Sequence, residues 1–143
     1  MNFNEIFNLG TSDQVRTGLV LLIILVIFLV IDIPMITYIN SNMYQIQFNR
    51  INNGPMNVNY RTYVSAGICY LLLVFGIYYF AVKQNSVLNG AILGLIIYGI
   101  YNTTNLATIN NFGIKESLVD TLWGTILCTI ITYITIKLKS YMN

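Results

Sequence analysis

Two aspartates lie within long apolar stretches of the sequence. Asp32 falls in the last third of the first stretch, and Asp120 lies at the start of the last one. A carboxylate in hydrocarbon is costly unless it is paired, protonated or facing a cavity, so both residues are candidates for binding or for acid–base chemistry. Pro34 adds to this, because a proline lacks the backbone N–H that would bond the carbonyl of Val30. The pattern predicts a kinked, polar-lined pocket near Asp32.

A stripe of small and polar side chains follows one face of the helix predicted over residues 87–108. At about 100° per residue, the stripe covers about 80° of arc. Its members are Gly90, Gly94, Tyr98, Tyr101, Asn105 and Thr108. The glycines would let another helix approach closely, and the polar half falls in the leaflet that holds both aspartates. We therefore predict a ligand-binding set without catalytic or metal-binding residues: Asp32, Tyr101, Asn105, Thr108, Asp120 and Trp123.

Each part of this set also has a structural interpretation. Ser117 and Asp120 have the spacing of a capping box, which would satisfy the backbone at the start of a helix. Asp32 could act only as a hydrogen-bond acceptor between helices. Trp123 could belong to an aromatic belt at the membrane interface. The sequence leaves these alternatives open.

Composition excludes several classes of function. Histidine is absent and the two cysteines, Cys69 and Cys128, lie in apolar stretches, so zinc sites, imidazole-ligated haem and Cys/His catalysis are unsupported. We expect no cofactor, and we expect the cysteines to be small apolar fillers. The net charge of +2 is too small for a nucleic-acid surface.

The elements that must position these residues are four membrane spans. Of the 143 residues, 56% are hydrophobic and only 8% are charged. The apolar stretches cover residues 17–39, 62–82, 87–108 and 118–136, and each has the roughly 20 residues that a membrane-spanning helix needs. We predict an all-α membrane protein, a single domain of four transmembrane helices in an up-down-up-down bundle. Residues 40–61 are expected to form a polar loop.

The ends of the chain bear on its orientation. The first stretch is too long for a cleavable signal, and Phe3, Phe7 and Leu9 could form a short interfacial helix before it. With the N-terminus inside, the cytoplasmic side would hold Arg16, Lys83, Lys137 and Lys139, and the other side Arg50, Arg61 and Lys115. This small excess predicts that both termini are cytoplasmic.

Two motifs resemble a family of small predicted membrane proteins catalogued as domain of unknown function 2177. They are Tyr101-Asn102-Thr103-Thr104-Asn105-Leu106-Ala107-Thr108 and Val119-Asp120-Thr121-Leu122-Trp123-Gly124, with a weaker match at Ile31-Asp32. The resemblance extends from Gly18 to Ile136 and implies four spans that share Asp32, Asn105, Asp120 and Trp123. Two departures are that Asn102 stands where the family usually has aspartate, and that no tryptophan follows Asp32. The resemblance implies no reaction.

Three functions are compatible with this pattern. The favoured one is a membrane protein whose polar pocket binds or transports a lipid-like or small amphiphilic ligand. The second is a structural or assembly protein of a cellular or viral membrane. The third is an intramembrane enzyme that uses Asp32 or Asp120 as a general acid or base on a lipid-like substrate. Besides the lipid bilayer, a second copy of the chain is a candidate partner through Gly90 and Gly94.

Overall fold

The computed structural model describes residues 11–141, with side chains for residues 13–140, and most of this part of the chain is helical. Of the described residues, 87% are helical and none lies in a strand, which confirms the all-α prediction. The elements are α2 (Thr11–Pro34), the π-helical η1 (Met35–Ile39), α3 (Ser41–Asn52), α4 (Tyr60–Ile77), the π-helical η2 (Tyr78–Val82), α5 (Val87–Thr108) and α6 (Ile114–Tyr141). The interfacial helix expected around Phe3, Phe7 and Leu9 lies outside the described residues.

Within residues 11–141, four helical segments are long and apolar enough to cross a membrane, as the sequence predicts. They are Asp13–Ile39, Tyr60–Val82, Val87–Thr108 and Ile114–Ser140. The third has the predicted bounds, whereas the fourth begins four residues before the predicted start at Leu118. Ser117 therefore lies inside α6, where its hydroxyl donates to the carbonyl of Gly113 at 2.7 Å. The capping box proposed for Ser117 and Asp120 is wrong, because the helix has already begun.

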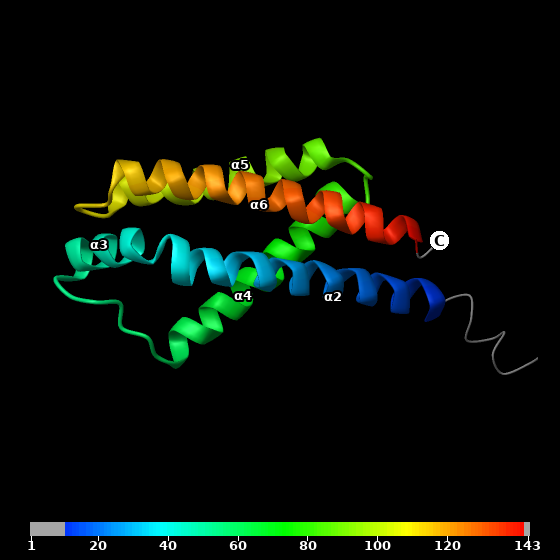
Figure 1. Cartoon of the computed structure of the whole chain (residues 1–143), viewed down its shortest axis with the longest axis horizontal. Coiled ribbons are helices and arrows are strands. Elements are labelled where there is room, and N and C mark those ends of the chain that lie inside the picture. Colours follow the sequence, from blue (N-terminus) through cyan, green and yellow to red (C-terminus); the bar gives the residue numbers. More distant parts are fainter. Residues whose placement is uncertain (1–10, 142–143) are drawn as a thin grey trace, which may run out of the picture.

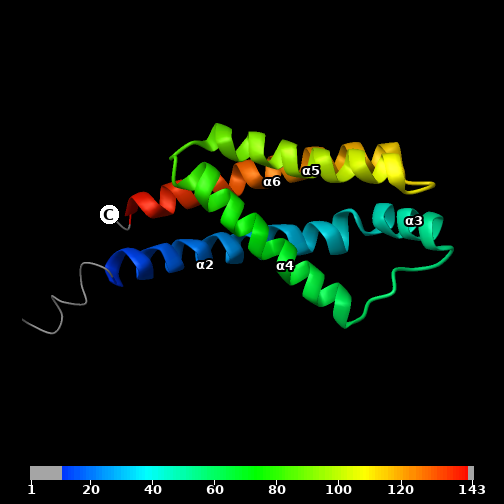
Figure 2. The ribbon, with the colours of Figure 1, turned by 180° about the vertical axis from the view of Figure 1, so that it is seen from behind.

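The segment predicted as a polar loop contains a helix, α3. Tyr44, Phe48 and Ile51 recur at the spacing of one helical face, and all three line a cavity together with residues of α5 and α6. Figures 1 and 2 show α3 beside the ends of α5 and α6 where those two helices are joined. The loop prediction for residues 40–61 is thus wrong for Ser41–Asn52. The error arose because the apolar face is short and interrupted by asparagine and glutamine.

Helix α5 packs along α6, whereas the other helices are arranged differently around it. In both views α5 and α6 lie side by side, whereas α4 crosses the bundle obliquely (Figures 1 and 2). The close approach of α5 to α6 depends on glycine, since a Cβ at Gly94 would lie 2.7 Å from the carbonyl oxygen of Gly124. A Cβ at Gly90 would overlap the side chain of Thr132. These two glycines are thus buried against α6 of the same chain, and association between copies of the chain stays a prediction.

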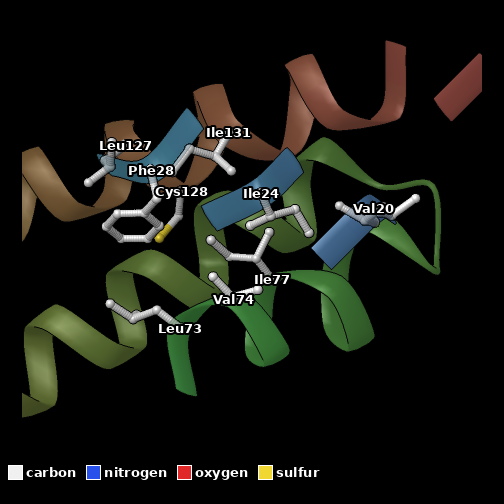
Figure 3. Packing of buried hydrophobic residues seen from close by; sticks show 10 residues of the cluster. Val20, Ile24, Phe28, Leu73, Val74, Ile77, Leu127, Cys128 and Ile131 are labelled. Atoms are coloured by element: carbon white, nitrogen blue, oxygen red, sulfur yellow. The ribbon is translucent and has the colours of Figure 1, made fainter. Parts of the chain in front are cut away.

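The apolar core joins α2, α4 and α6 (Figure 3). Its buried side chains are Val20, Ile24 and Phe28 of α2, Leu73, Val74 and Ile77 of α4, Val82 of η2, and Leu127, Cys128 and Ile131 of α6. On α2 these residues are four apart, and the next residue in that row is Asp32. Large apolar side chains elsewhere on the helices stay exposed, for example Val30 at 66% and Leu72 at 68%. Such apolar faces suit contact with lipid, because the hydrocarbon core of a membrane contains no water.

Helix α2 changes geometry at Pro34. The proline cannot donate a backbone hydrogen bond, and the chain continues as the π-helical turn η1, in which the amide of Asn40 bonds the carbonyl of Met35 at 2.9 Å. The turn carries the chain from the membrane span into α3. It thereby places Tyr44 of α3 next to the start of α6, which the site described below requires.

Candidate functional site

Asp32 accepts hydrogen bonds from two other helices. The hydroxyl of Tyr70 on α4 donates to Oδ2 at 2.8 Å, and the indole N–H of Trp123 on α6 donates to Oδ1 at 3.0 Å. Asp32 is 6% exposed, and the ring of Tyr70 packs edge-on against Phe28, one turn earlier on α2. A single carboxylate thus connects α2, α4 and α6. The inward orientation predicted for Asp32 agrees with this geometry.

Asp120 makes a second set of contacts towards the end of the bundle. The hydroxyl of Tyr44 on α3 donates to Oδ1 at 2.7 Å, and the amide of Asn102 on α5 donates to Oδ2 at 2.8 Å. Burial, together with the nearby Asp120 carboxylate, raises the pKa of the Tyr44 hydroxyl, so this group stays protonated and donates. Both donors are neutral, so the hydrogen bonds hold the Asp120 carboxylate without neutralising its charge.

Asn102, like Tyr44 and Tyr70, belongs to the site but was absent from the ligand-binding set predicted from the sequence. It is 3% exposed, and its amide also donates to the carbonyl of Tyr98 at 3.0 Å. The contacts of α5 with α6 follow Gly90, Gly94, Tyr98 and Asn102, which are four residues apart. Each such step turns about 40° around the helix, so the row leaves the straight stripe that contained Asn105. The spacing of four after the glycines was the signal that could have identified Asn102.

An inter-helix cavity of about 310 Å³ lies next to both aspartates. Its wall comes from α2, α3, α4, α5 and α6 and combines carboxylates, aromatic rings and aliphatic side chains. The lining residues are Asp32, Ile36, Tyr44, Ala66, Cys69, Tyr70, Leu73, Ile97, Tyr98, Tyr101, Asp120 and Trp123. A concave, mostly apolar space with a few converging polar groups is the usual form of a small-molecule site.

A second space, the end cavity, has a volume of about 260 Å³ and lies between α3, the end of α5 and the start of α6. It is more polar and is lined by Tyr44, Gln47, Phe48, Ile51, Asn52, Tyr101, Asn102, Ile109, Phe112, Glu116 and Asp120. Tyr44, Tyr101 and Asp120 line both cavities. The hydrogen bond between Tyr44 and Asp120 therefore lies in the wall that the two cavities share.

The structure brings together four of the six predicted ligand-binding residues. Asp32, Tyr101, Asp120 and Trp123 all line the inter-helix cavity. Asn105 and Thr108 line neither cavity. The side chain of Thr108 is exposed and donates to the carbonyl of Thr104 in its own helix at 2.8 Å. The C-terminal part of the predicted stripe, Asn105 and Thr108, thus does not join the aspartates in either cavity.

The two cysteines occupy different surroundings, and both are free thiols. Cys128 is buried in the apolar core, as predicted for a small filler. Cys69 is exposed and lines the inter-helix cavity, which differs from the filler role expected of it. Between residues 11 and 141, no three His, Cys, Asp or Glu side chains gather as a metal site would require.

Comparison with known families identifies the chain. The family described as "Predicted membrane protein (DUF2177)" matches residues 17–137. The chain belongs to this family. It is accordingly a membrane protein with four candidate transmembrane helices. Comparisons with curated proteins and with solved structures found no match.

The two motifs that carry the family resemblance face each other in space. The first occupies the end of α5 and the second the start of α6, and the amide of Asn102 donates across to both Asp120 and Thr121. Asn102, noted in the sequence as a departure from the family pattern, is thus the donor of the bond to Asp120.

Proposed function

We propose that this protein binds a lipid-like or small amphiphilic molecule within the membrane, in the inter-helix cavity. The observation that carries the proposal is the juxtaposition, in one cavity, of the Asp32 carboxylate with an otherwise largely apolar wall. The volume of about 310 Å³ lies at the lower end of the range for small-molecule sites. Transport of the same molecule would use the same site.

The two ends of an amphiphile match two parts of the cavity wall. Ile36, Leu73 and Ile97 offer apolar surface to a hydrocarbon chain. Asp32 offers oxygen lone pairs beyond the two hydrogen bonds that it already accepts from Tyr70 and Trp123. The cavity thus suits a ligand that carries a donor group on an apolar body. The proposed orientation of the protein has both termini on the cytoplasmic side, following the distribution of Lys and Arg.

The test is purification in mild detergent followed by mass spectrometry of the lipids and small molecules that co-purify. We compare the parent protein with Ile97→Trp, which fills the cavity, and with Ile96→Trp as the matched control. Ile96 is the neighbouring residue, is 50% exposed and does not line the cavity. A species that is present in the parent and in Ile96→Trp but absent from Ile97→Trp supports the proposal.

The same experiment can favour the structural alternative. Asp32 joins three helices, so its carboxylate also stabilises the bundle. If no species distinguishes the parent from Ile97→Trp, while both proteins are folded, the cavity has no resident ligand. The polar residues would then serve only to hold the helices together.

A further inference from the structure

Resting on the proposed function, we propose that the ligand is a single-chain amphiphile with an alkylammonium headgroup. Its chain lies in the inter-helix cavity and its ammonium group lies in the end cavity, against Asp120. The hydrogen bond from Tyr44 to Asp120 closes the passage between the two cavities until the ammonium group takes the place of the Tyr44 hydroxyl.

The shared wall allows one molecule to occupy both spaces. Tyr44, Tyr101 and Asp120 line both cavities, so removing the Tyr44 side chain from Asp120 would join the two spaces. The inter-helix cavity is the more apolar part, and the end cavity adds Gln47, Asn52 and Glu116. This gradient in polarity fits an amphiphile whose headgroup points towards the end of the bundle.

The charge of the wall favours a cation. Glu116 has its own partner, because its carboxylate lies 3.7 Å from the guanidinium of Arg50. The hydrogen-bond partners of Asp32 and Asp120 are neutral, and among residues 13–140 no Lys or Arg forms an ion pair with either carboxylate. In a cavity of low dielectric, uncompensated carboxylates attract a positive charge strongly.

The end cavity also offers an acceptor and several aromatic side chains. The Oε1 atom of Gln47 is buried and has no hydrogen-bond partner within the described part of the chain, which is costly for a carbonyl oxygen. An ammonium group has three N–H donors and could satisfy Gln47 and Asp120 together. Tyr44 and Tyr101 also line this cavity, and aromatic side chains are favourable neighbours for a cation.

Tyr44 and Asn102 have different roles at Asp120. Tyr44 holds Oδ1 and belongs to α3, whereas Asn102 holds Oδ2 and belongs to α5, which packs closely on α6. An entering ammonium group therefore displaces Tyr44, while Asn102 keeps the carboxylate in place. Tyr44 competes with the ligand for the same oxygen of Asp120. Removing the Tyr44 hydroxyl should therefore strengthen ligand binding, which is not expected if the contact is purely structural.

The experiment uses Trp123, the one tryptophan of the sequence, as a fluorescent reporter, since it lines the inter-helix cavity. Dodecylamine, which is protonated at neutral pH, and dodecanol are titrated into the protein in lipid nanodiscs. Asp120→Asn should weaken dodecylammonium binding at least about tenfold, and Tyr44→Phe should strengthen it by several-fold, since each changes one charge-assisted contact. Both changes should affect dodecanol binding much less than dodecylammonium binding, because the alcohol carries no charge. Asp13→Asn and Tyr38→Phe are matched controls at exposed positions.

The outcomes separate this inference from the proposed function. Equal affinity of the parent for both amphiphiles, with no effect of Asp120→Asn, overturns the ammonium assignment and leaves amphiphile binding intact. Weaker dodecylammonium binding in Tyr44→Phe overturns the gating role of Tyr44. If neither amphiphile changes the fluorescence of Trp123 in the parent, the proposed function itself loses its support. Retained dodecanol binding in each variant shows that the cavity is still folded.

Discussion

The indole N–H of Trp123 lies 3.0 Å from Oδ1 of Asp32, a residue 91 positions earlier in the chain. This hydrogen bond connects α6 to α2 next to the inter-helix cavity. Together with the bond from Tyr70, it satisfies one acceptor site on each oxygen of a buried carboxylate. The arrangement makes the carboxylate a structural connection and a binding group at once, and substitutions can separate the two roles.

Asp32→Asn and Asp32→Leu should differ strongly in stability. Asparagine keeps the shape and one acceptor oxygen, so we expect a loss of about 1 kcal/mol in the free energy of unfolding. Leucine leaves two part-buried donors, the hydroxyl of Tyr70 and the indole N–H of Trp123, without their acceptor, at a cost of about 3 kcal/mol. Unfolding in detergent measures both values. If the binding role holds, Asp32→Asn loses the ligand while it stays folded.

Trp123→Phe should cost about 2 kcal/mol, because it removes a hydrogen bond to a charged acceptor. Most of this cost should disappear in the Asp32→Leu background, where the indole has no acceptor to lose. The measurement is a double-mutant cycle on the free energy of unfolding. Additive effects of the two substitutions would mean that Trp123 contributes packing and not a hydrogen bond.

Gly94→Ala should destabilise the bundle by about 2 kcal/mol through overpacking. The added Cβ would lie 2.7 Å from the carbonyl oxygen of Gly124 and 3.0 Å from the Cα of Thr125, which are backbone atoms that cannot rotate away. Gly99→Ala is the control, because the nearest atom to its added Cβ, Cγ2 of Thr121, is 4.0 Å away. Thermal unfolding in detergent compares the two, and equal midpoints would contradict the close contact of α5 with α6.

Asn102→Asp should destabilise the bundle. The substitution removes the amide that donates to Asp120 and places a second carboxyl group beside it, so we expect the free energy of unfolding to fall by about 2 kcal/mol. Unfolding in detergent measures the loss. Asn105→Asp is the control, since Asn105 lines neither cavity. An equal loss in both variants would rule out a specific contact between position 102 and Asp120.

Labelling of introduced cysteines should test the path of the chain through the membrane. Cysteines at Asn57 and Asn110 should react from one side of the membrane and a cysteine at Gln84 from the other, with Cys69 and Cys128 replaced by serine and alanine. These exposed positions avoid the neighbouring asparagines with positive φ, such as Asn53 at 52° and Asn111 at 65°, where other side chains are strained. Reaction of Asn57 and Gln84 cysteines from one side would refute the alternating path.

The sequence by itself determined the helical class, the four apolar spans and the inward orientation of Asp32. The reason is the solvent: an apolar helix of this length belongs in lipid, and a carboxylate that deep in the span has to avoid it. In the structure Val20, Ile24, Phe28 and Asp32 form one buried row along α2.

Only the tertiary structure decided which partners the aspartates meet. Lipid is as apolar as leucine. Hydrophobicity therefore does not distinguish the face of a helix that packs against other helices from the face that contacts lipid. The choice of Asn102 over Asn105 follows from the way α5 packs on α6 through Gly90 and Gly94, a relationship between two helices. The position of α3, which brings Tyr44 to Asp120, likewise depends on contacts with α5 and α6 that no local pattern encodes.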